Sequence, residues 1–210
     1  LLATGQDNSM FTKASAQTFQ TKSWTTAAGF ADFDLDGHLD LVVIGYARWA
    51  AANHLDCIAD GGNDYCDVKM YDGLADHVYK GNGLGGFSDT SANWNFGSIP
   101  GRGLGAALTD FDDDGFVDVY VANDTEANRY YKNDQGMGFL DRTDLSGASC
   151  NLDGRFEAGM GVAVGDTTGN GLAGIVVTNF TSESNNLFEN MGGGRFRERS
   201  RLAGIAKASI

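Results

Sequence analysis

The hydrophobic pattern of this chain consists of short apolar runs, each bounded by polar, glycine-rich turns. The longest β-like runs, such as residues 41–44 and 174–177, have the length of a single strand. None approaches the roughly 20 apolar residues that a membrane-spanning helix requires. The pattern therefore predicts an all-β protein built from short strands, without a membrane span.

Three segments repeat one order of features: an apolar run, an Asp-rich loop with a fixed glycine, and a second apolar run. They cover residues 28–44, 107–123 and 163–179. Each is followed by a predicted hairpin, in which a glycine turn joins an alternating strand to a strand that opens on phenylalanine. The end of a fourth hairpin precedes them. The opening phenylalanines are Phe11, Phe87, Phe139 and Phe196.

Four short strands per unit and a single proline are typical of β-propeller blades. We predict a partial propeller of about three to four blades. Because an open arc would expose sheet edges, we expect further blades of the same protein or neighbouring copies to cover its ends. The predicted divisions are 1–20 (the end of a preceding blade), 21–95 (a repeat with an insertion), 96–148 and 149–210.

The first two Asp-rich loops share the pattern D-x-D-x-D-G-x-x-D. Alternating carboxylates converge when a tight loop coils around a point, and they would repel one another strongly without a cation. Calcium takes six to eight oxygen ligands, so two calcium sites are predicted. The expected ligands, which include the main-chain carbonyl of the seventh residue, are Asp32, Asp34, Asp36, His38, Asp40, Asp110, Asp112, Asp114, Phe116 and Asp118.

An EF-hand shares the first six positions of this pattern, but it needs a glutamate at position twelve and a helix afterwards. Position twelve is Val43 or Val121, and β-branched residues surround it, so each loop is expected to join two strands. The other alternative is an Asp-rich turn without a metal.

In the third copy, Asp166 is kept, whereas Thr168, Asn170 and Gly174 replace the other carboxylates. We expect weak or no calcium binding there.

These residues resemble the FG-GAP/VCBS repeats of integrin α-subunit propellers and of many secreted proteins. Finer features are similar to the cartilage acidic protein and ASPIC/UnbV group: residues 64–66 before the Tyr79-Lys80 hairpin, and the glycine-rich runs 101–105 and 159–162. The resemblance covers nearly the whole chain. It implies a calcium-bearing propeller, usually of seven blades, outside the cytoplasm, with a role in adhesion or scaffolding.

Three cysteines are present. Cys57 and Cys66 bracket a short polar loop, and we predict a disulfide that holds this insertion on the surface. Two free thiols are the alternative, while zinc is disfavoured because no C-x-x-C motif occurs. Cys150 is left without an assigned partner.

The formal net charge is -13, from 15 Lys and Arg against 28 Asp and Glu. The negative electrostatic field of this charge repels a phosphate backbone, so no nucleic-acid partner is expected. No G-x-S-x-G or H-E-x-x-H motif occurs. The leading hypothesis is a non-enzymatic extracellular module that binds protein or glycan partners at the propeller faces. The alternatives are a propeller domain of a carbohydrate-active or lipid-active enzyme, and a subunit of an extracellular polymer.

Two further features stay open at the level of sequence. Asn123 and Asn179 lie in glycosylation sequons, but both also end the second strand of their units and could be structural. Trp24, Trp49 and Trp94 could stack on sugars, although core packing is the favoured interpretation.

Overall fold

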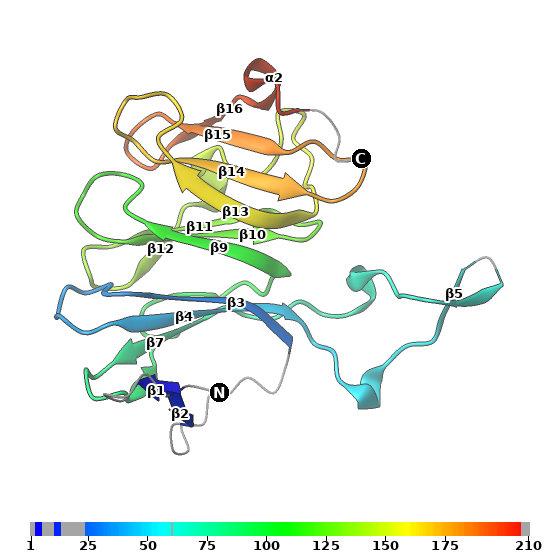
Figure 1. Cartoon of the computed structure of the whole chain (residues 1–210), viewed down its shortest axis with the longest axis horizontal. Coiled ribbons are helices and arrows are strands. Elements are labelled where there is room, and N and C mark those ends of the chain that lie inside the picture. Colours follow the sequence, from blue (N-terminus) through cyan, green and yellow to red (C-terminus); the bar gives the residue numbers. More distant parts are fainter. Residues whose placement is uncertain (1–2, 6–10, 14–23, 60, 207–210) are drawn as a thin grey trace.

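The computed structural model describes residues 3–5, 11–13, 24–59 and 61–206. Its main feature is a stack of three four-stranded antiparallel sheets (Figure 1). In each sheet the strands are ordered along the chain, so every unit is an up-and-down meander. The strands are β3 (Trp24–Ala31), β4 (Asp40–Ala47), β7 (His77–Gly81) and β8 (Phe87–Asp89); β9 (Gly103–Thr109), β10 (Asp118–Asn123), β11 (Arg129–Asn133) and β12 (Phe139–Asp141); and β13 (Gly159–Gly165), β14 (Gly174–Asn179), β15 (Asn186–Asn190) and β16 (Phe196–Glu198).

The remaining elements are short. Two small hairpins pair β1 (Ala3–Gly5) with β2 (Phe11–Lys13) and β5 (Cys57–Ala59) with β6 (Gly62–Asp64). The α-helices are α1 (Thr143–Ser146) and α2 (Ser200–Ala203), and 3-10 turns cover Ala51–Asn53 and Val68–Met70. None of the helices in the described ranges is long and apolar enough to cross a membrane. The described chain is therefore all-β, as the sequence predicts.

The predicted hairpins that open on phenylalanine are all present. Phe87 pairs with Gly81, Phe139 with Asn133 and Phe196 with Asn190, each at the start of the outer strand. Phe11 pairs with Gly5 in the same way. The rest of the segment predicted to end a preceding blade (residues 1–2, 6–10 and 14–20) lies outside the described residues.

The first strands of the three sheets lie side by side, with β9 packed against both β3 and β13 (Figure 1). This approach is close because β9 is rich in glycine and alanine. A Cβ atom on Gly105 would lie 2.6 Å from the main-chain oxygen of Met160 in β13, which no real side chain tolerates.

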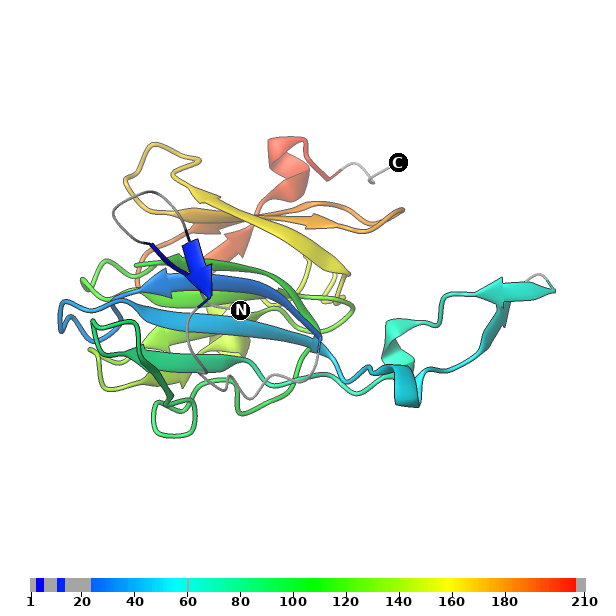
Figure 2. The ribbon, with the colours of Figure 1, turned by 60° about the horizontal axis from the view of Figure 1, so that its bottom comes forward.

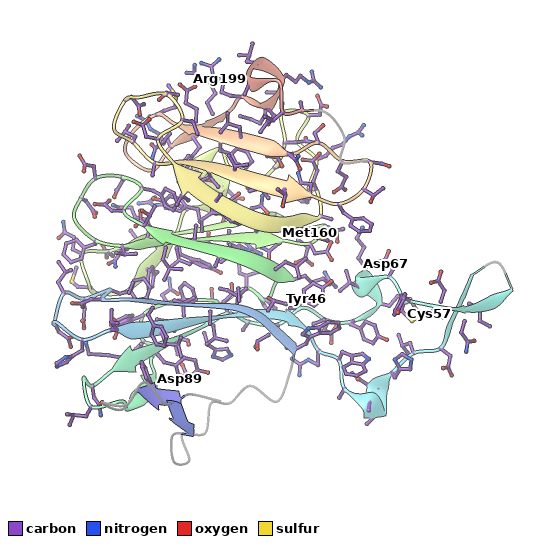
Figure 3. All side chains as sticks on the ribbon, in the orientation of Figure 1. Tyr46, Cys57, Asp67, Asp89, Met160 and Arg199 are labelled. Carbon is purple, nitrogen blue, oxygen red and sulfur yellow. A yellow bond between two sulfur atoms is a disulfide. The ribbon has the colours of Figure 1, made fainter. Side chains whose placement is uncertain are left out.

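The hydrophobic core consists of two layers, one in each gap between sheets, and Figure 3 shows side chains filling both gaps. Strand β10 supplies both layers. Val119 and Val121 pack toward the first sheet, whereas Tyr120 and Ala122 pack toward the third. All four are fully buried, and each large side chain contributes about 1.5–3 kcal/mol by leaving water. Because successive side chains of β10 point to opposite faces of its sheet, this strand holds the stack together from its centre.

The insertion in the first unit forms an arm that leaves the end of β4 and extends away from the sheets (Figures 1 and 2). The main-chain bond from Arg48 N to Asp72 O, at 2.8 Å, closes the base of the arm. Cys57 and Cys66 form the predicted disulfide within it. The arm and the loops that follow β3, β9 and β13 lie at opposite edges of the stack, so the disulfide is remote from the Asp-rich loops.

Candidate metal centre

The first aspartate of each Asp-rich loop organises the loop backbone. Asp110 Oδ1 accepts hydrogen bonds from the N–H groups of Asp113 (2.7 Å) and Asp114 (3.2 Å), and its Oδ2 accepts one from Gly115 (2.8 Å). Asp32 accepts equivalent bonds from Asp36 and Gly37. The sixth residue, glycine in both loops, has a φ of 85° or 90°, which favours glycine because it lacks a Cβ atom.

The last aspartate of the pattern is a buried anchor at the start of the second strand. Asp118 Oδ2 accepts hydrogen bonds from Phe111 N (3.1 Å) and Tyr130 Oη (2.9 Å), and its Oδ1 accepts one from Asn133 N (2.7 Å). Burial raises the pKa of Asp118 to about 6, although these bonds oppose the rise. In the first unit, Asp40 accepts the equivalent bonds from the N–H groups of Phe33 and Gly81, and burial raises the pKa of Asp40 too. These carboxylates therefore tie each loop to the third strand of its sheet.

Three of the four predicted carboxylates converge in each complete loop. One oxygen from each of Asp32, Asp34 and Asp40 lies within 4.8 Å of the others, and Asp110, Asp112 and Asp118 form a matching cluster. Oδ1 of the third-position aspartate is buried without a hydrogen-bond partner in both clusters, at Asp34 and Asp112. A buried acceptor without a donor costs free energy, so each cluster is suited to a cation. Its purely oxygen donors fit calcium or magnesium better than a softer metal.

The remaining predicted carboxylate of each loop, at the fifth position, pairs with a lysine. Lys80 Nζ lies 2.7 Å from Asp36 Oδ2, and Lys132 Nζ lies 2.7 Å from Asp114 Oδ2. Each lysine also contacts the third-position aspartate of its loop. The hydrogen bond from Lys80 lowers the pKa of Asp36. Sequence reasoning missed both lysines, although a Tyr-Lys pair recurs in the two units with complete loops.

The seventh residues, His38 and Phe116, lie beside the aspartate at the fifth position of their loop. Their N–H groups donate to Oδ1 of Asp36 (2.9 Å) and of Asp114 (3.0 Å). That their carbonyl oxygens bind calcium stays a prediction.

The third loop keeps its conformation through hydrogen bonds. Asp166 Oδ1 accepts from the N–H groups of Thr168 (3.1 Å), Gly169 (2.7 Å) and Asn170 (3.2 Å), and its Oδ2 accepts from Gly171 (2.8 Å). Within the described part of the chain, Asp166 belongs to no convergent carboxylate cluster. The loop therefore retains the turn with a single carboxylate, and its weak or absent calcium binding stays a prediction.

The two sequon asparagines are buried at the ends of β10 and β14. Asn123 Nδ2 donates to Ala127 O at 2.8 Å, and Asn179 Nδ2 donates to Asn186 Oδ1 at 2.6 Å. A glycan is attached through this same nitrogen, so the structure favours the structural role over glycosylation at both positions. Cys150 has a free thiol and is half-buried.

No family model and no curated protein matches the sequence. Among solved structures, the chain is similar to a lectin from Agrocybe aegerita, described by its specific recognition of non-reducing terminal N-acetylglucosamine. The two are 20% identical, with a TM-score of 0.40. The match covers 81% of this chain and 50% of the lectin chain, so this chain spans about half the length of the lectin that it matches.

Proposed function

We propose that this chain is a calcium-stabilised group of β-propeller blades that serves as a non-enzymatic binding module outside the cytoplasm. The observation that carries the calcium assignment is the pair of buried, unpartnered Oδ1 atoms at Asp34 and Asp112. They occupy equivalent positions in two carboxylate clusters of the same composition. One such atom could be incidental, whereas its repetition in both complete loops supports a shared ligand.

Calcium would neutralise carboxylates that come from both sides of a loop. Asp32 and Asp34 lie within the first loop, whereas Asp40 begins β4, so the ion would join the loop to the sheet. Phe33 of this loop packs against Phe139 of the second sheet, with ring centroids 5.3 Å apart. Phe111 packs in the same way against Phe196 of the third sheet, at 5.5 Å. Order in each loop should therefore strengthen the contact between neighbouring sheets.

Two features support the propeller assignment. Each unit is a four-stranded meander, and the first strands of the units lie together. The units are also joined by matching asparagines. Asn133 Nδ2 donates to Phe33 O in the preceding unit (2.9 Å), and Asn190 Nδ2 donates to Phe111 O (2.8 Å).

The disulfide supports a location outside the cytoplasm, because such bonds persist in oxidising compartments. Protein or glycan partners would bind at the propeller faces.

Calorimetric titration of the metal-free protein with calcium tests the metal assignment. We expect two sites in the unmodified chain and one in either Asp34→Asn or Asp112→Asn. Asp166→Asn, which alters the third loop, is the matched control and should keep both sites. A chain that takes up no calcium at millimolar concentration, or three variants that behave alike, would show that the loops are turns without a metal.

Assembly through the ends of the stack is a second candidate function. The first sheet exposes the apolar side chain of Phe30 on its face turned away from the second sheet, because Phe30 pairs with Leu41 and not with Val42 or Ile44 of the core layer. Sedimentation at increasing protein concentration, with Phe30→Ser beside the unmodified chain, tests this candidate. Self-association that the substitution weakens supports it, and a single monomeric species at all concentrations contradicts it.

A further inference from the structure

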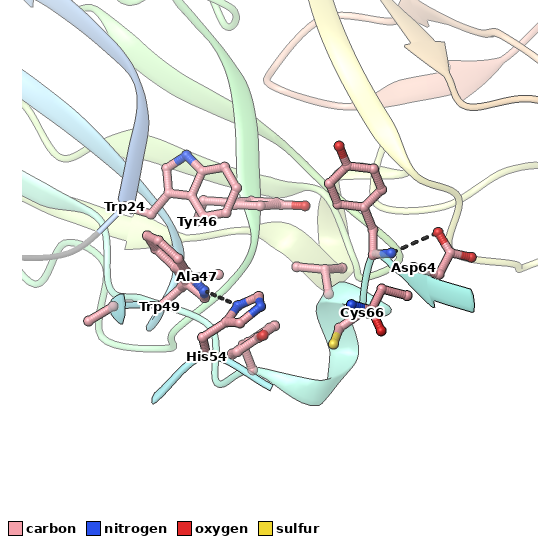
Figure 4. A pocket seen from close by; sticks show the side chains of 12 residues that line it. Trp24, Tyr46, Ala47, Trp49, His54, Asp64 and Cys66 are labelled. Atoms are coloured by element: carbon pink, nitrogen blue, oxygen red, sulfur yellow. Dashed lines mark hydrogen bonds between the residues drawn. The ribbon is translucent and has the colours of Figure 1, made fainter. Parts of the chain in front are cut away.

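A cavity of about 1000 Å³ lies between the end of the first sheet and the insertion arm (Figure 4). Aromatic side chains dominate its described lining, and they come from both sides of it. Trp24 and Tyr46 belong to the sheet, whereas Trp49, Tyr65 and Tyr71 belong to the arm. Cys66 also lines the cavity, so the disulfide fixes the part of the arm that forms one wall.

The tryptophans of this cavity are not core residues. Trp24 is 51% exposed and Trp49 is 39% exposed, so the core-packing interpretation is wrong for both. The Trp24 ring stands at 78° to Tyr46 and at 66° to Trp49, with centroids 5.2 Å and 6.1 Å apart. The three rings therefore form walls of differing orientation and not a single flat platform.

Three of the five aromatic rings, those of Tyr46, Trp49 and Tyr71, have a polar atom engaged within the protein. Trp49 Nε1 donates to Nδ1 of His54 at 3.3 Å, and Tyr46 Oη donates to Oδ2 of Asp124 at 2.8 Å. Tyr71 Oη accepts a bond from the N–H group of Leu55 at 3.2 Å. These three rings consequently offer a ligand mainly their π faces. A neutral sugar, which is recognised through several directional hydrogen bonds, is served less well by such walls.

The charge around the cavity favours a cation. Asp64 lines it, and none of the described lining residues is a lysine or an arginine. The arm as a whole carries five aspartates (56, 60, 64, 67 and 72) against Arg48 and Lys69, in a chain of net charge -13. A cation is attracted electrostatically to the faces of tryptophan and tyrosine, and quaternary ammonium groups are the usual ligands of such aromatic sites. The acidic surroundings would also raise its local concentration.

We propose that this cavity binds an organic ammonium ion, with Trp24, Trp49 and Tyr46 facing the cationic head and Asp64 supplying the countercharge. The site is separate from the Asp-rich loops, which lie at the opposite edge of the stack (Figure 1). Its occupation does not depend on calcium in the loops, so the proposal stands apart from the proposed metal function.

A comparison of two probes on the unmodified protein tests the proposal. Choline carries a quaternary nitrogen, and 3,3-dimethyl-1-butanol has nearly the same shape without the charge. Calorimetry, with tryptophan fluorescence as a second readout, should give choline at least tenfold tighter binding than the neutral analogue. Equal affinity for the two probes, no binding of choline at millimolar concentration, or tighter binding of N-acetylglucosamine than of choline would each overturn the proposal.

Variants locate the binding. Trp49→Ala and Trp24→Ala should each weaken choline binding at least tenfold, whereas Asp64→Asn should weaken choline severalfold and leave the neutral analogue unchanged. Ile58→Ala is the matched control, because Ile58 is 74% exposed on the same arm and does not line the cavity. Unaltered choline binding in both tryptophan variants would contradict the assignment. Should either tryptophan variant fail to fold, the Asp64→Asn comparison still decides the result.

Discussion

Lys132 lies between two carboxylates of the second Asp-rich loop, with its Nζ 2.7 Å from Asp114 Oδ2 and also in contact with Asp112. Lys80 repeats this arrangement in the first loop, where its Nζ also lies over the ring of Trp94, 5.7 Å from the centroid. In the third unit, Glu189 takes the equivalent place and pairs with Arg199 at 2.7 Å. The lysine thus occurs on the third strand of the two units whose loops keep all four aspartates, and it is absent from the unit whose loop keeps only one.

Substitution of the lysine should strengthen calcium binding. A positive charge beside the cluster opposes a second cation, so Lys132→Gln is expected to raise calcium affinity at the second loop by about three- to tenfold, which is about 1 kcal/mol for charges near a surface. Calorimetry on the Asp34→Asn background isolates this loop. Lys69→Gln, on the arm, is the control for a change of net charge alone. An affinity that falls in Lys132→Gln would mean that the lysine supports the metal-bound loop.

Removal of the buried anchor should destabilise the chain even without a metal. Asp118→Ala leaves the N–H groups of Phe111 and Asn133 and the hydroxyl of Tyr130 without their acceptor. Each unsatisfied buried donor costs about 1–3 kcal/mol, so we expect a loss of about 3–5 kcal/mol in the free energy of unfolding. Urea denaturation in EGTA measures it, with exposed Asp153→Ala as the control. A loss that appears only in calcium buffer would assign Asp118 to metal binding alone.

Asp76 should make stability depend on pH near neutrality. Its side chain is 95% buried beside Gly45, whose N–H group donates to Oδ1 at 3.0 Å. Burial raises the pKa of Asp76 from 3.8 to about 7, with the Gly45 hydrogen bond and the charge of Arg129 opposing the rise. Because the folded-state pKa exceeds the unfolded one, the stabilisation is complete below pH 4 and is lost as the pH rises through 7.

Asp76→Asn should abolish that loss, since an amide oxygen still accepts from Gly45 and cannot ionise. The variant is therefore expected to match the parent near pH 4 and to exceed it near pH 8, by on the order of 4 kcal/mol. Chemical denaturation in calcium-free buffer across this range measures the difference. Parallel stability curves for parent and variant would show that Asp76 does not titrate in this window.

The sequence predicts the repeating unit well, because its main determinants are local. Each outer strand opens on a phenylalanine, and the first Asp of each loop binds main-chain groups within five residues. The roles of Lys80 and Lys132 depend on contacts across a sheet, 44 and 18 residues from the paired aspartates, so spacing alone does not reveal them. The cavity beside Trp24 likewise forms only where the arm leaves the end of the first sheet, so its lining joins residues that are distant in the sequence.

The asparagines that join neighbouring units should control the metal sites of the preceding loops. Asn133 Nδ2 binds the carbonyl of Phe33 in the first loop, whereas Asn190 Nδ2 binds that of Phe111 in the second. Removal of either bond frees the loop that must be ordered for calcium to bind, so an ordering cost of about 1 kcal/mol should appear as roughly fivefold weaker affinity.

The two asparagines serve as controls for each other at the first loop. On an Asp112→Asn background, which leaves the first site alone, Asn133→Ala should weaken calcium binding and Asn190→Ala should not, because the Asn190 side chain bonds the carbonyls of Phe111 and Ala173. Calorimetric titration of both double variants, checked for folding by thermal denaturation, gives the comparison. Equal losses in the two variants would mean that the asparagines act through general stability, whereas a loss confined to Asn133→Ala would place the coupling at the contact with Phe33.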